Sequence, residues 1–498
     1  MFQTLRHMGM HQPTGKQLRR DNVAGIAILT ISLAAVFSTV GCGNQYRPVV
    51  SAIGSVGPAG QPTKFAVAVS NPCPTLLSTC GSLGLLTIVD FSGDTVLSTP
   101  QILTDPSYFA LNTSGSQGYT INAHGSLDTF PILPYLITSQ VVQTTLPVDS
   151  APVSITSLTP ASALATIFIP ETATNSIAAI NAGTAALYDT VAVGAGGTNP
   201  VYVVGAAGTP RVYAISQNAT GSNGQIDSLE TVSTTSLSDS GTIPVGVKPV
   251  YGVMTPDDRR AFILNEGSGT VSVMNVPSNA LDTNMPTITI PAISIAGGGT
   301  TAPNPVWADL NTVDSELVVL NQGDGVHPGT ISVINIPLCN PLAEANNPNC
   351  VASNPVDAVG FGTILATATV GINPTMVSVL QGTDGNSPAA YVINQLDGTG
   401  TCATGQGSVT VVNLLTGKIS ATICGISGTT ATAAANGTSN LIFGHPNSVS
   451  ATGGSPTGKV YVTASDNQYL SVIYTDTNSV QTHIPLQGNG LRVLVTAP

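Results

Sequence analysis

The sequence predicts an all-β protein, a β-propeller whose blades are four-stranded antiparallel sheets. Short segments rich in Val, Ile and Thr recur along the chain and are separated by Gly, Asn, Ser or Pro, which is typical of strands joined by tight turns. They recur in groups of four with a period of 46 to 72 residues, which indicates propeller blades. The composition agrees: 52 Gly and 35 Pro suit many turns, and a hydrophobic fraction of 42% is too high for a disordered chain.

Residues 1–41 are interpreted as a signal peptide. Residues 1–20 carry four Lys or Arg and no acidic residue, and residues 23–40 form a nearly continuous apolar run. The run leads into Thr39-Val40-Gly41-Cys42, which resembles a bacterial lipobox with Thr39 where Leu is usual. That resemblance implies export, cleavage before Cys42 and lipidation of Cys42. The alternative is an uncleaved anchor, since 18 apolar residues are just long enough to span a bilayer.

Residues 42–62 are rich in Gly and Pro and predict a flexible tether. Residues 63–498 contain no linker or shift in composition, so we assign them to one propeller domain.

A proline opens the same apolar segment in seven copies of the repeat. Proline has no backbone donor and is tolerated at the first residue of a strand, so it predicts where an inner strand begins. An eighth segment, at residues 490–495, lacks the proline. The seven positions are Pro106, Pro152, Pro200, Pro249, Pro305, Pro374 and Pro446.

The strand that follows each inner strand can also be traced, and its copies number eight. Pro131 falls inside the third strand of the second copy and suggests an irregular blade there. Seven blades remain the alternative if this copy, or residues 64–155, do not make a full blade. The eight copies of this second strand start at Lys64, Gly118, Ala165, Arg211, Ala261, Leu317, Ala390 and Lys459.

The strand of the repeat with which the propeller begins, and the one with which it ends, predict how the ring closes. The propeller begins at a second strand, near Lys64, and ends with an inner strand at residues 490–496. The last inner strand must therefore complete a first blade built from residues 64–102, which would cover the open edges of both.

Several copies resemble the YVTN repeat family of propellers. The segments AFILNEGSGTVSVMNV (residues 261–276) and KVYVTASDNQYLSVIYTD (residues 459–476) match its unit, an aromatic-Val-Thr-Asn strand, a polar turn and a Val-Ser-Val-Ile-Asp strand. The resemblance covers residues 64–498 and implies an exported bacterial propeller, usually of seven blades. It implies no single activity, because such propellers include binding proteins, lactonases and redox subunits.

Six cysteines remain beside the lipobox residue, and an even number in an exported protein predicts disulfides. Six cysteines allow fifteen connectivities. A metal site is the alternative, but none of the four His left after processing lies near a cysteine pair in the sequence. Proximity predicts three bonds, Cys73 to Cys80, Cys339 to Cys350 and Cys402 to Cys424.

The sequence shows no nucleophile elbow, phosphate loop, zinc helix or haem-attachment motif, so we assign no catalytic, cofactor or metal residue. Acidic turns at residues 265–269, 321–325 and 395–400 offer one carboxylate each, whereas calcium needs six to eight oxygens. Turn chemistry explains them without an ion. We interpret His327 and Asp324 as a solvated loop pair. Trp307 is expected to pack between blades, with a place in a ligand funnel as the alternative.

The net charge of the chain argues against nucleic acids as partners. Without residues 1–41 the chain has nine Lys and Arg against 24 Asp and Glu, a formal charge of −15 that repels nucleic acids.

We therefore expect a monomeric binding platform in the cell envelope, held to a periplasmic, outer-membrane or cell-surface leaflet by its lipid only. Its ligand would be an unknown protein, glycan or small molecule, and no cofactor is expected. Ser, Thr, Gly and aliphatic side chains should line the channel of such a platform. The alternative, a lactonase-like hydrolase, would need His, Glu and Arg side chains converging at the channel. Three or more carboxylate, His or Asn side chains meeting at one point there would favour a metal-assisted hydrolase. A redox accessory subunit is disfavoured by a single Trp and few His.

Overall fold

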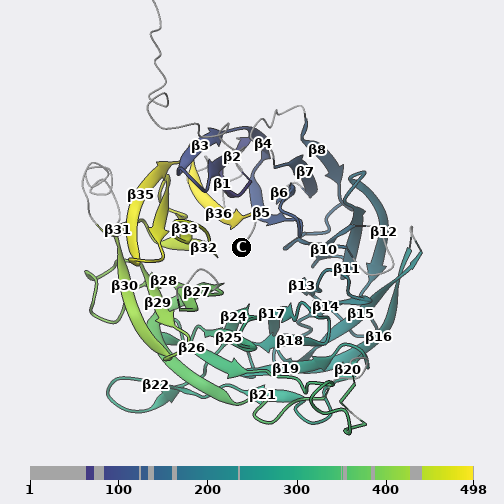
Figure 1. Ribbon diagram of the computed structural model, residues 1–498. Coiled ribbons are helices and arrows are strands. Elements are labelled where there is room, and N and C mark those ends of the chain that lie inside the picture. Colours follow the sequence, from purple (N-terminus) through teal and green to yellow (C-terminus); the bar gives the residue numbers. More distant parts are fainter. Residues whose placement is uncertain are drawn as a thin grey trace, which may run out of the picture. The chain divides into compact units, whose positions relative to one another are not determined.

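The protein is described here from a computed structural model (Figure 1). The structure describes residues 63–71, 83–122, 125–132, 140–159, 165–233, 236–348, 350–351, 356–382, 387–426 and 440–496. The predicted signal peptide and tether, with Cys42, lie outside these ranges, and so do Cys73 and Cys80.

Within the described residues the strands form eight antiparallel blades around a central channel, as Figure 1 shows. The prediction of a propeller and the count of eight are confirmed, and the alternative of seven is not. The inner strands, from the first to the eighth blade, are β36 (Asn489–Val495), β5 (Pro106–Leu111), β9 (Thr156–Leu158), β13 (Pro200–Val204), β17 (Pro249–Met254), β24 (Pro305–Asn311), the second half of β27 (Ile364–Leu380) and β32 (Pro446–Thr452).

The second and third strands carry most of the core. The second strands are β1 (Phe65–Asn71), β6 (Gln117–Asn122), β10 (Thr166–Glu171), β14 (Arg211–Ser216), β18 (Arg260–Asn265), β25 (Glu316–Asn321), β28 (Ala389–Leu396) and β33 (Lys459–Ala464). The third strands are β2 (Leu83–Asp90), β7 (Ser126–Pro131), β11 (Ser176–Asn181), β15 (Asn223–Ser233), β19 (Thr270–Asn275), β26 (Pro328–Asn335), β29 (Ser408–Asn413) and β34 (Tyr469–Tyr474).

The outer strands are shorter or broken in several blades. They are β3 (Thr95–Ser98) with β4 (Gln101–Thr104), β8 (Val142–Thr145), β12 (Ala186–Ala192), β16 (Ser236–Val247), β20 (Ala280–Leu281) with β21 (Thr287–Thr289), the first half of β27, β30 (Lys418–Ile426) and β35 (Ser479–Pro485). Outside the blades, β22 (Ile293–Ser294) and β23 (Thr300–Thr301) form a hairpin, and β31 (Leu441–Phe443) runs parallel to β30.

Five of the seven marker prolines open an inner strand, and two do not. Pro374 lies inside β27, because the outer strand of the sixth blade continues without a loop into the inner strand of the seventh. Pro152 forms only an isolated bridge to Glu171, and β9 begins at Thr156. The prediction that proline always starts the strand is therefore wrong at these two positions.

The core lies between blades, because both faces of a blade are buried. In β25, Leu317 and Val319 pack with Phe262 of the fifth blade, whereas Val318 and Leu320 belong to the cluster shared with the seventh. Successive side chains of a strand point to opposite faces, so a strand buried on both must be apolar at every position. This explains why the strand segments read as continuous apolar runs.

A buried asparagine ties the second strand to the third in three neighbouring blades. Each side-chain amide donates hydrogen bonds of 2.9 to 3.1 Å to two hydroxyl groups that lie two residues apart on the third strand. An amide buried without partners would cost about 1–3 kcal/mol, so the Asn and its two hydroxyls must occur together. The groups are Asn265 with Thr270 and Ser272, Asn321 with Thr330 and Ser332, and Asn394 with Ser408 and Thr410.

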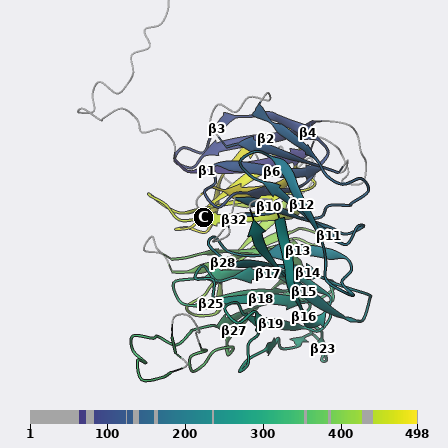
Figure 2. The ribbon, with the colours of Figure 1, turned by 90° about the vertical axis from the view of Figure 1, so that its right-hand side faces the viewer.

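The first blade joins the two ends of the propeller. β36 pairs with β1 in antiparallel register, as the phase of the repeat predicts, and Figure 1 shows yellow β36 beside purple β1. The Phe65 N–H donates to Thr496 Oγ1 at 2.9 Å, and the Thr496 N–H donates to the Phe65 carbonyl at 2.9 Å. In the side view of Figure 2 the purple and yellow strands again lie together.

The described residues contain two disulfides, and both are pairs that the spacing predicts. Cys339 and Cys350 join the two sides of the insertion between β26 and β27, with Cα atoms 5.9 Å apart. Cys402 and Cys424 connect the β28–β29 turn to β30, with Cα atoms 5.4 Å apart. Such bonds persist in oxidising compartments, which indicates a location outside the cytoplasm. Within the part of the chain described, no helix has the length and apolar character to cross a membrane.

Deleting residues 489–498 should prevent stable folding. The deletion removes β36, exposes the edge of β1 and takes buried Val493 and Val495 out of the core. Each buried Val contributes about 1.5–3 kcal/mol, and the total stability of a protein is only about 5–15 kcal/mol. We expect loss of the cooperative thermal transition in circular dichroism. A protein lacking only residues 497–498 is the control, and a parental melting temperature in the longer deletion would contradict the closure.

Candidate binding site in the central channel

The residue two positions after each marker proline occupies the same place on every blade. We call these eight residues the channel ring; in β36, which lacks the proline, the position is counted from Gly490. Its members are Arg492, Tyr108, Ser154, Tyr202, Tyr251, Trp307, Met376 and Ser448, from the first to the eighth blade.

The backbone explains why these side chains are set apart from the core. The pairing register shifts by one residue directly after the proline in the six blades where it is paired within a strand, for example between Pro249 and Tyr251 and between Pro305 and Trp307. Such a bulge leaves one residue unpaired and changes the direction of the next side chain. The residue before the proline often has a positive φ, as in Lys248 (52°) and Asn304 (49°), and this bends the chain into the channel.

Aromatic side chains on three consecutive blades stack along the ring. The Tyr202 and Tyr251 ring centroids are 4.6 Å apart, and the Tyr251 and Trp307 centroids are 4.1 Å apart with 16° between their planes. The Arg492 guanidinium carbon lies 4.3 Å from the centroid of Tyr108 and 5.7 Å from that of Trp307. Because Arg492 is on the first blade and Trp307 on the sixth, the second of these contacts reaches across the channel rather than around it.

One cavity on the described residues has a volume of about 480 Å³, and a second has a volume of about 190 Å³. The smaller one lies at the channel ring, where the inner strands of five blades begin. It is lined by Ser107, Tyr108, Trp307, Thr375, Met376, Asn447, Ser448, Leu491 and Arg492.

Two polar atoms on the wall of the channel cavity are buried and have no hydrogen-bond partner, Arg492 Nε and Thr375 Oγ1. Asn447, by contrast, donates to the carbonyl groups of Gly490 and Leu491 and accepts from Thr463. Burial raises the pKa of Tyr202 to about 12, so this phenol stays neutral. The arginine is a cation at any physiological pH.

Asp309, two residues after Trp307, acts electrostatically on the ring. It raises the pKa of Tyr251, after the larger effects of burial and of the neighbouring Tyr202 and Tyr108. Its carboxylate accepts hydrogen bonds of 2.8 Å from the backbone N–H of Leu310 and from that of Val379 on the next blade. Burial raises the pKa of Asp309 to about 6, and the two backbone donors oppose this shift. The carboxyl group therefore titrates close to neutral pH while it links two inner strands.

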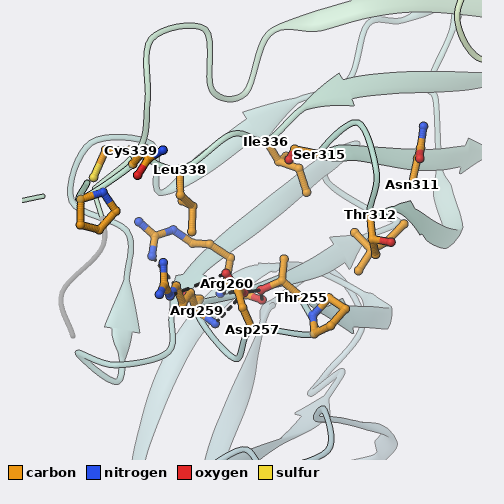
Figure 3. A pocket seen from close by; sticks show the side chains of 14 residues that line it. Thr255, Asp257, Arg259, Arg260, Asn311, Thr312, Ser315, Ile336, Leu338 and Cys339 are labelled. Atoms are coloured by element: carbon orange, nitrogen blue, oxygen red, sulfur yellow. Dashed lines mark hydrogen bonds and ion pairs between the residues drawn. The ribbon is translucent and has the colours of Figure 1, made fainter. Parts of the chain in front are cut away.

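The larger cavity lies at the opposite ends of the inner strands (Figure 3). In Figure 3, Arg259 and Cys339 lie on one side and Asn311 and Thr312 on the other. Fully buried Arg260 forms ion pairs with Asp282 at 3.0 Å and Asp357 at 2.9 Å. Asp357 belongs to the disulfide-bonded insertion, so this triad fastens the insertion to the fifth blade. The larger cavity thus borders a structural ion-pair triad, in which two carboxylates share one guanidinium.

The three histidines of the described residues have hydrogen-bond and ring partners outside the channel ring. His327 Nδ1 lies 2.7 Å from Asp324 Oδ2, and both side chains are exposed, which agrees with a solvated loop pair. His445 bonds to Asp466 at 2.7 Å. His483 stacks on Phe443 with ring centroids 3.7 Å apart, and burial lowers its pKa to about 4.

The acidic turns use their carboxylates locally. Glu266 pairs with Lys248 at 2.6 Å, and Asp397 accepts from the backbone N–H groups of Thr399, Thr401 and Cys402. Among the residues described, no group of three or more His, Cys, Asp or Glu side chains is placed to hold a metal ion.

The channel differs from the one expected for a platform, because aromatic side chains and an arginine dominate its ring instead of Ser, Thr, Gly and aliphatic residues. Trp307 packs against the cluster between the sixth and seventh blades and against the cluster between the seventh and eighth, and it also lines the channel cavity. Sequence reasoning did not single out Tyr108, Tyr202, Tyr251 or Arg492. The available signal was their shared distance from the proline.

No protein-family model matches the chain, and neither does any curated protein. A solved structure of dihydro-heme d1 dehydrogenase NirN is similar, with a TM-score of 0.56 and 12% identity, over 87% of this chain and 76% of that one. A putative 6-phosphogluconolactonase from Bacteroides fragilis has a TM-score of 0.47 and 11% identity over 88% of this chain and 99% of its own. AztD from Citrobacter koseri has a TM-score of 0.48 and 10% identity, over 87% and 97%. The likeness to NirN, at this identity, concerns the propeller fold alone.

Replacing Asp309 with Asn should make stability less dependent on pH. The folded pKa of about 6 exceeds the unfolded value of about 3.9, so the parent binds the proton more tightly when folded. The associated stability is complete below about pH 4 and is lost as the pH rises through 6. Between pH 4 and 7.5 the parent should therefore lose up to about 2 kcal/mol relative to Asp309→Asn.

Urea unfolding at pH 4, 5.5 and 7.5 measures this difference. Asp149→Asn, at an exposed turn, is the matched control and should follow the parent at every pH. A constant difference between the parent and Asp309→Asn would show that the Asp309 carboxyl is not shifted.

Proposed function

We propose that the chain is an exported, lipid-anchored propeller of the YVTN type that acts as a binding platform and holds a small molecule at the channel ring. The observation that carries the proposal is the cavity in which Arg492 and Trp307 meet across the channel. The cavity combines the aromatic and apolar side chains of Tyr108, Trp307, Met376 and Leu491 with the polar groups of Arg492 and Thr375. Such a combination of packing surface and directed polar groups is usual in small-molecule sites.

The proposed location rests on the first 62 residues together with the disulfides. In this proposal, residues 1–41 are removed, Cys42 carries the lipid and residues 42–62 form the tether. Two disulfides in the propeller are consistent with an oxidising compartment.

Binding is favoured over catalysis because the ring offers few reactive groups. Asp309 already accepts two backbone hydrogen bonds, and none of the three described histidines bonds to or stacks on a ring side chain. General acid–base catalysis needs such groups within hydrogen-bond reach of the substrate. Of the His, Glu and Arg side chains that the lactonase-like alternative needs, Arg492 lines the channel cavity, and Asp309 is a carboxyl group that acts on the ring.

The binding proposal is tested with thermal unfolding of the mature protein in a library of small aromatic and aliphatic molecules. A compound at 100 times its dissociation constant stabilises the folded state by about 2.7 kcal/mol. Compounds that raise the melting temperature of the parent should fail to do so in Trp307→Ala, which removes a cavity wall. Val326→Ala, at an exposed loop position, is the control and should respond like the parent.

The same compounds stabilising Trp307→Ala as strongly as the parent would place their site elsewhere. Hydrolysis of a sugar lactone in a pH-stat, if it were abolished by Asp309→Asn, would favour the hydrolase instead.

The anchor is tested by expressing Cys42→Ala in a bacterium that processes lipoproteins. We expect the parent in the membrane fraction and Cys42→Ala either unprocessed or released, because a thiol is required for lipid attachment. Cys73→Ala is the matched control and should stay in the membrane fraction. Normal cleavage and membrane retention of Cys42→Ala would disprove lipidation at this residue.

A further inference from the structure

Arg492 is exceptional among the arginines that the structure describes. Arg211 pairs with Glu230, Arg259 with Asp257, and Arg260 with two aspartates. Arg492 forms no ion pair with a carboxylate of the described residues; its guanidinium lies over the faces of Tyr108 and Trp307 and also hydrogen-bonds to the Tyr108 side chain. Aromatic faces attract a cation without accepting its hydrogen bonds, and the buried Nε of Arg492 has no partner.

A second polar group on the wall of the channel cavity, the Thr375 hydroxyl, also has no hydrogen-bond partner. Thr375 Oγ1 is buried and lines the channel cavity together with Arg492. A buried polar atom without a partner costs about 1–3 kcal/mol, so a ligand that hydrogen-bonds to both of these atoms would recover that cost. Arg492 Nε can only donate and the threonine hydroxyl can donate, which calls for a ligand with two acceptor oxygens.

The charges of the residues that line the channel cavity favour a ligand with a single negative charge. Arg492 is the cation of this cavity, and the mature chain carries a formal charge of −15. A dianion such as a phosphate would add a second negative charge that no described lysine or arginine of the cavity lining neutralises. A carboxylate has one charge and two coplanar oxygens that match the guanidinium group.

The volume and the lining of the channel cavity limit the size and shape of the part of the ligand that carries the carboxylate. A cavity of about 190 Å³ is below the roughly 300 Å³ at which drug-sized sites begin. Trp307, Met376 and Leu491 supply apolar surface, and Trp307 belongs to the stacked aromatic row. Aromatic side chains pack well against flat groups.

We infer that the channel cavity binds a small planar carboxylate, with its oxygens accepting hydrogen bonds from Arg492 and Thr375 and its flat body against Trp307. This inference rests on the proposed function, because it requires the channel ring to be the binding site. The carboxylate can belong to a free organic acid or to the carboxyl terminus of a peptide.

Isothermal titration of the mature protein tests this chemistry with matched probes. Benzoate supplies the ring and the carboxylate, benzamide is its neutral counterpart, and phenyl phosphate carries the dianion. Since hydrogen bonds to charged groups contribute more than neutral ones, we expect benzoate to bind about ten- to hundred-fold more tightly than benzamide. An N-acetylated dipeptide ending in Phe, compared with its carboxamide, distinguishes a peptide terminus from a free acid.

Substitutions of Arg492 and Thr375 test whether these two side chains donate the hydrogen bonds to the carboxylate. Arg492→Gln should remove the preference for benzoate over benzamide, and Thr375→Val should weaken benzoate several-fold and leave benzamide unchanged. Arg259→Gln, an arginine of the other cavity, is the control and should retain the parental affinities. If Arg492→Gln does not fold, the benzoate-to-benzamide ratio of the parent still decides the question.

Different results would contradict the carboxylate inference and the proposed function. Equal affinity for benzoate and benzamide, or tighter binding of phenyl phosphate, overturns the carboxylate inference and leaves the channel as a binding site. No binding by any of the probes up to their solubility overturns the inference, and if Trp307→Ala also fails to discriminate among library compounds, the proposed function falls with it.

Discussion

The antiparallel pairing of β36 with β1 is the contact on which both the ring and the candidate site depend. It brings the last strand of the propeller to its first blade and turns an open row of sheets into a closed ring. The same strand carries Arg492, the cation of the channel cavity. Closure of the fold therefore also completes the site, because Arg492 can contact Tyr108 and Trp307 only when β36 is in register.

The channel ring shows how a repeated backbone accommodates different chemistry. The proline and the bulge after it are shared among blades, whereas the side chain that follows ranges from Ser to Trp. Where the ring residue is Ser, it bonds to the next inner strand, as Ser154 does to the Val201 carbonyl at 2.9 Å. Tyr202, Tyr251 and Trp307 instead contact one another through their rings, and Tyr108 lies under the Arg492 guanidinium. Blades are thus joined by either means, and the channel cavity lies between Trp307 and Tyr108, on the side that includes Met376, Ser448 and Arg492.

Much of the fold could be predicted because its signals are local. Val-rich runs, turn residues and the prolines are each visible within a few positions, and the phase of the repeat is enough to place residues 490–496 beside residues near Lys64. The contact between Arg492 and Trp307 could not be predicted in this way, because it depends on where two distant blades stand in the ring. The same limit applies to Pro374, where only the structure shows that two strands run together. The partner of Arg260 was equally invisible, since Asp357 comes from an insertion without repeat character.

The central claim is that the site lies at the channel ring, and Trp307 reports on it directly because it is the only tryptophan in the chain. The decisive measurement is the intrinsic fluorescence of the mature protein, excited selectively at tryptophan, during a titration with benzoate. The account predicts a change in the Trp307 emission that saturates at the dissociation constant found by calorimetry, with reduced quenching by iodide. Heat of binding that saturates while the emission and its quenching stay unchanged would show that the ligand binds away from the channel and would contradict the account.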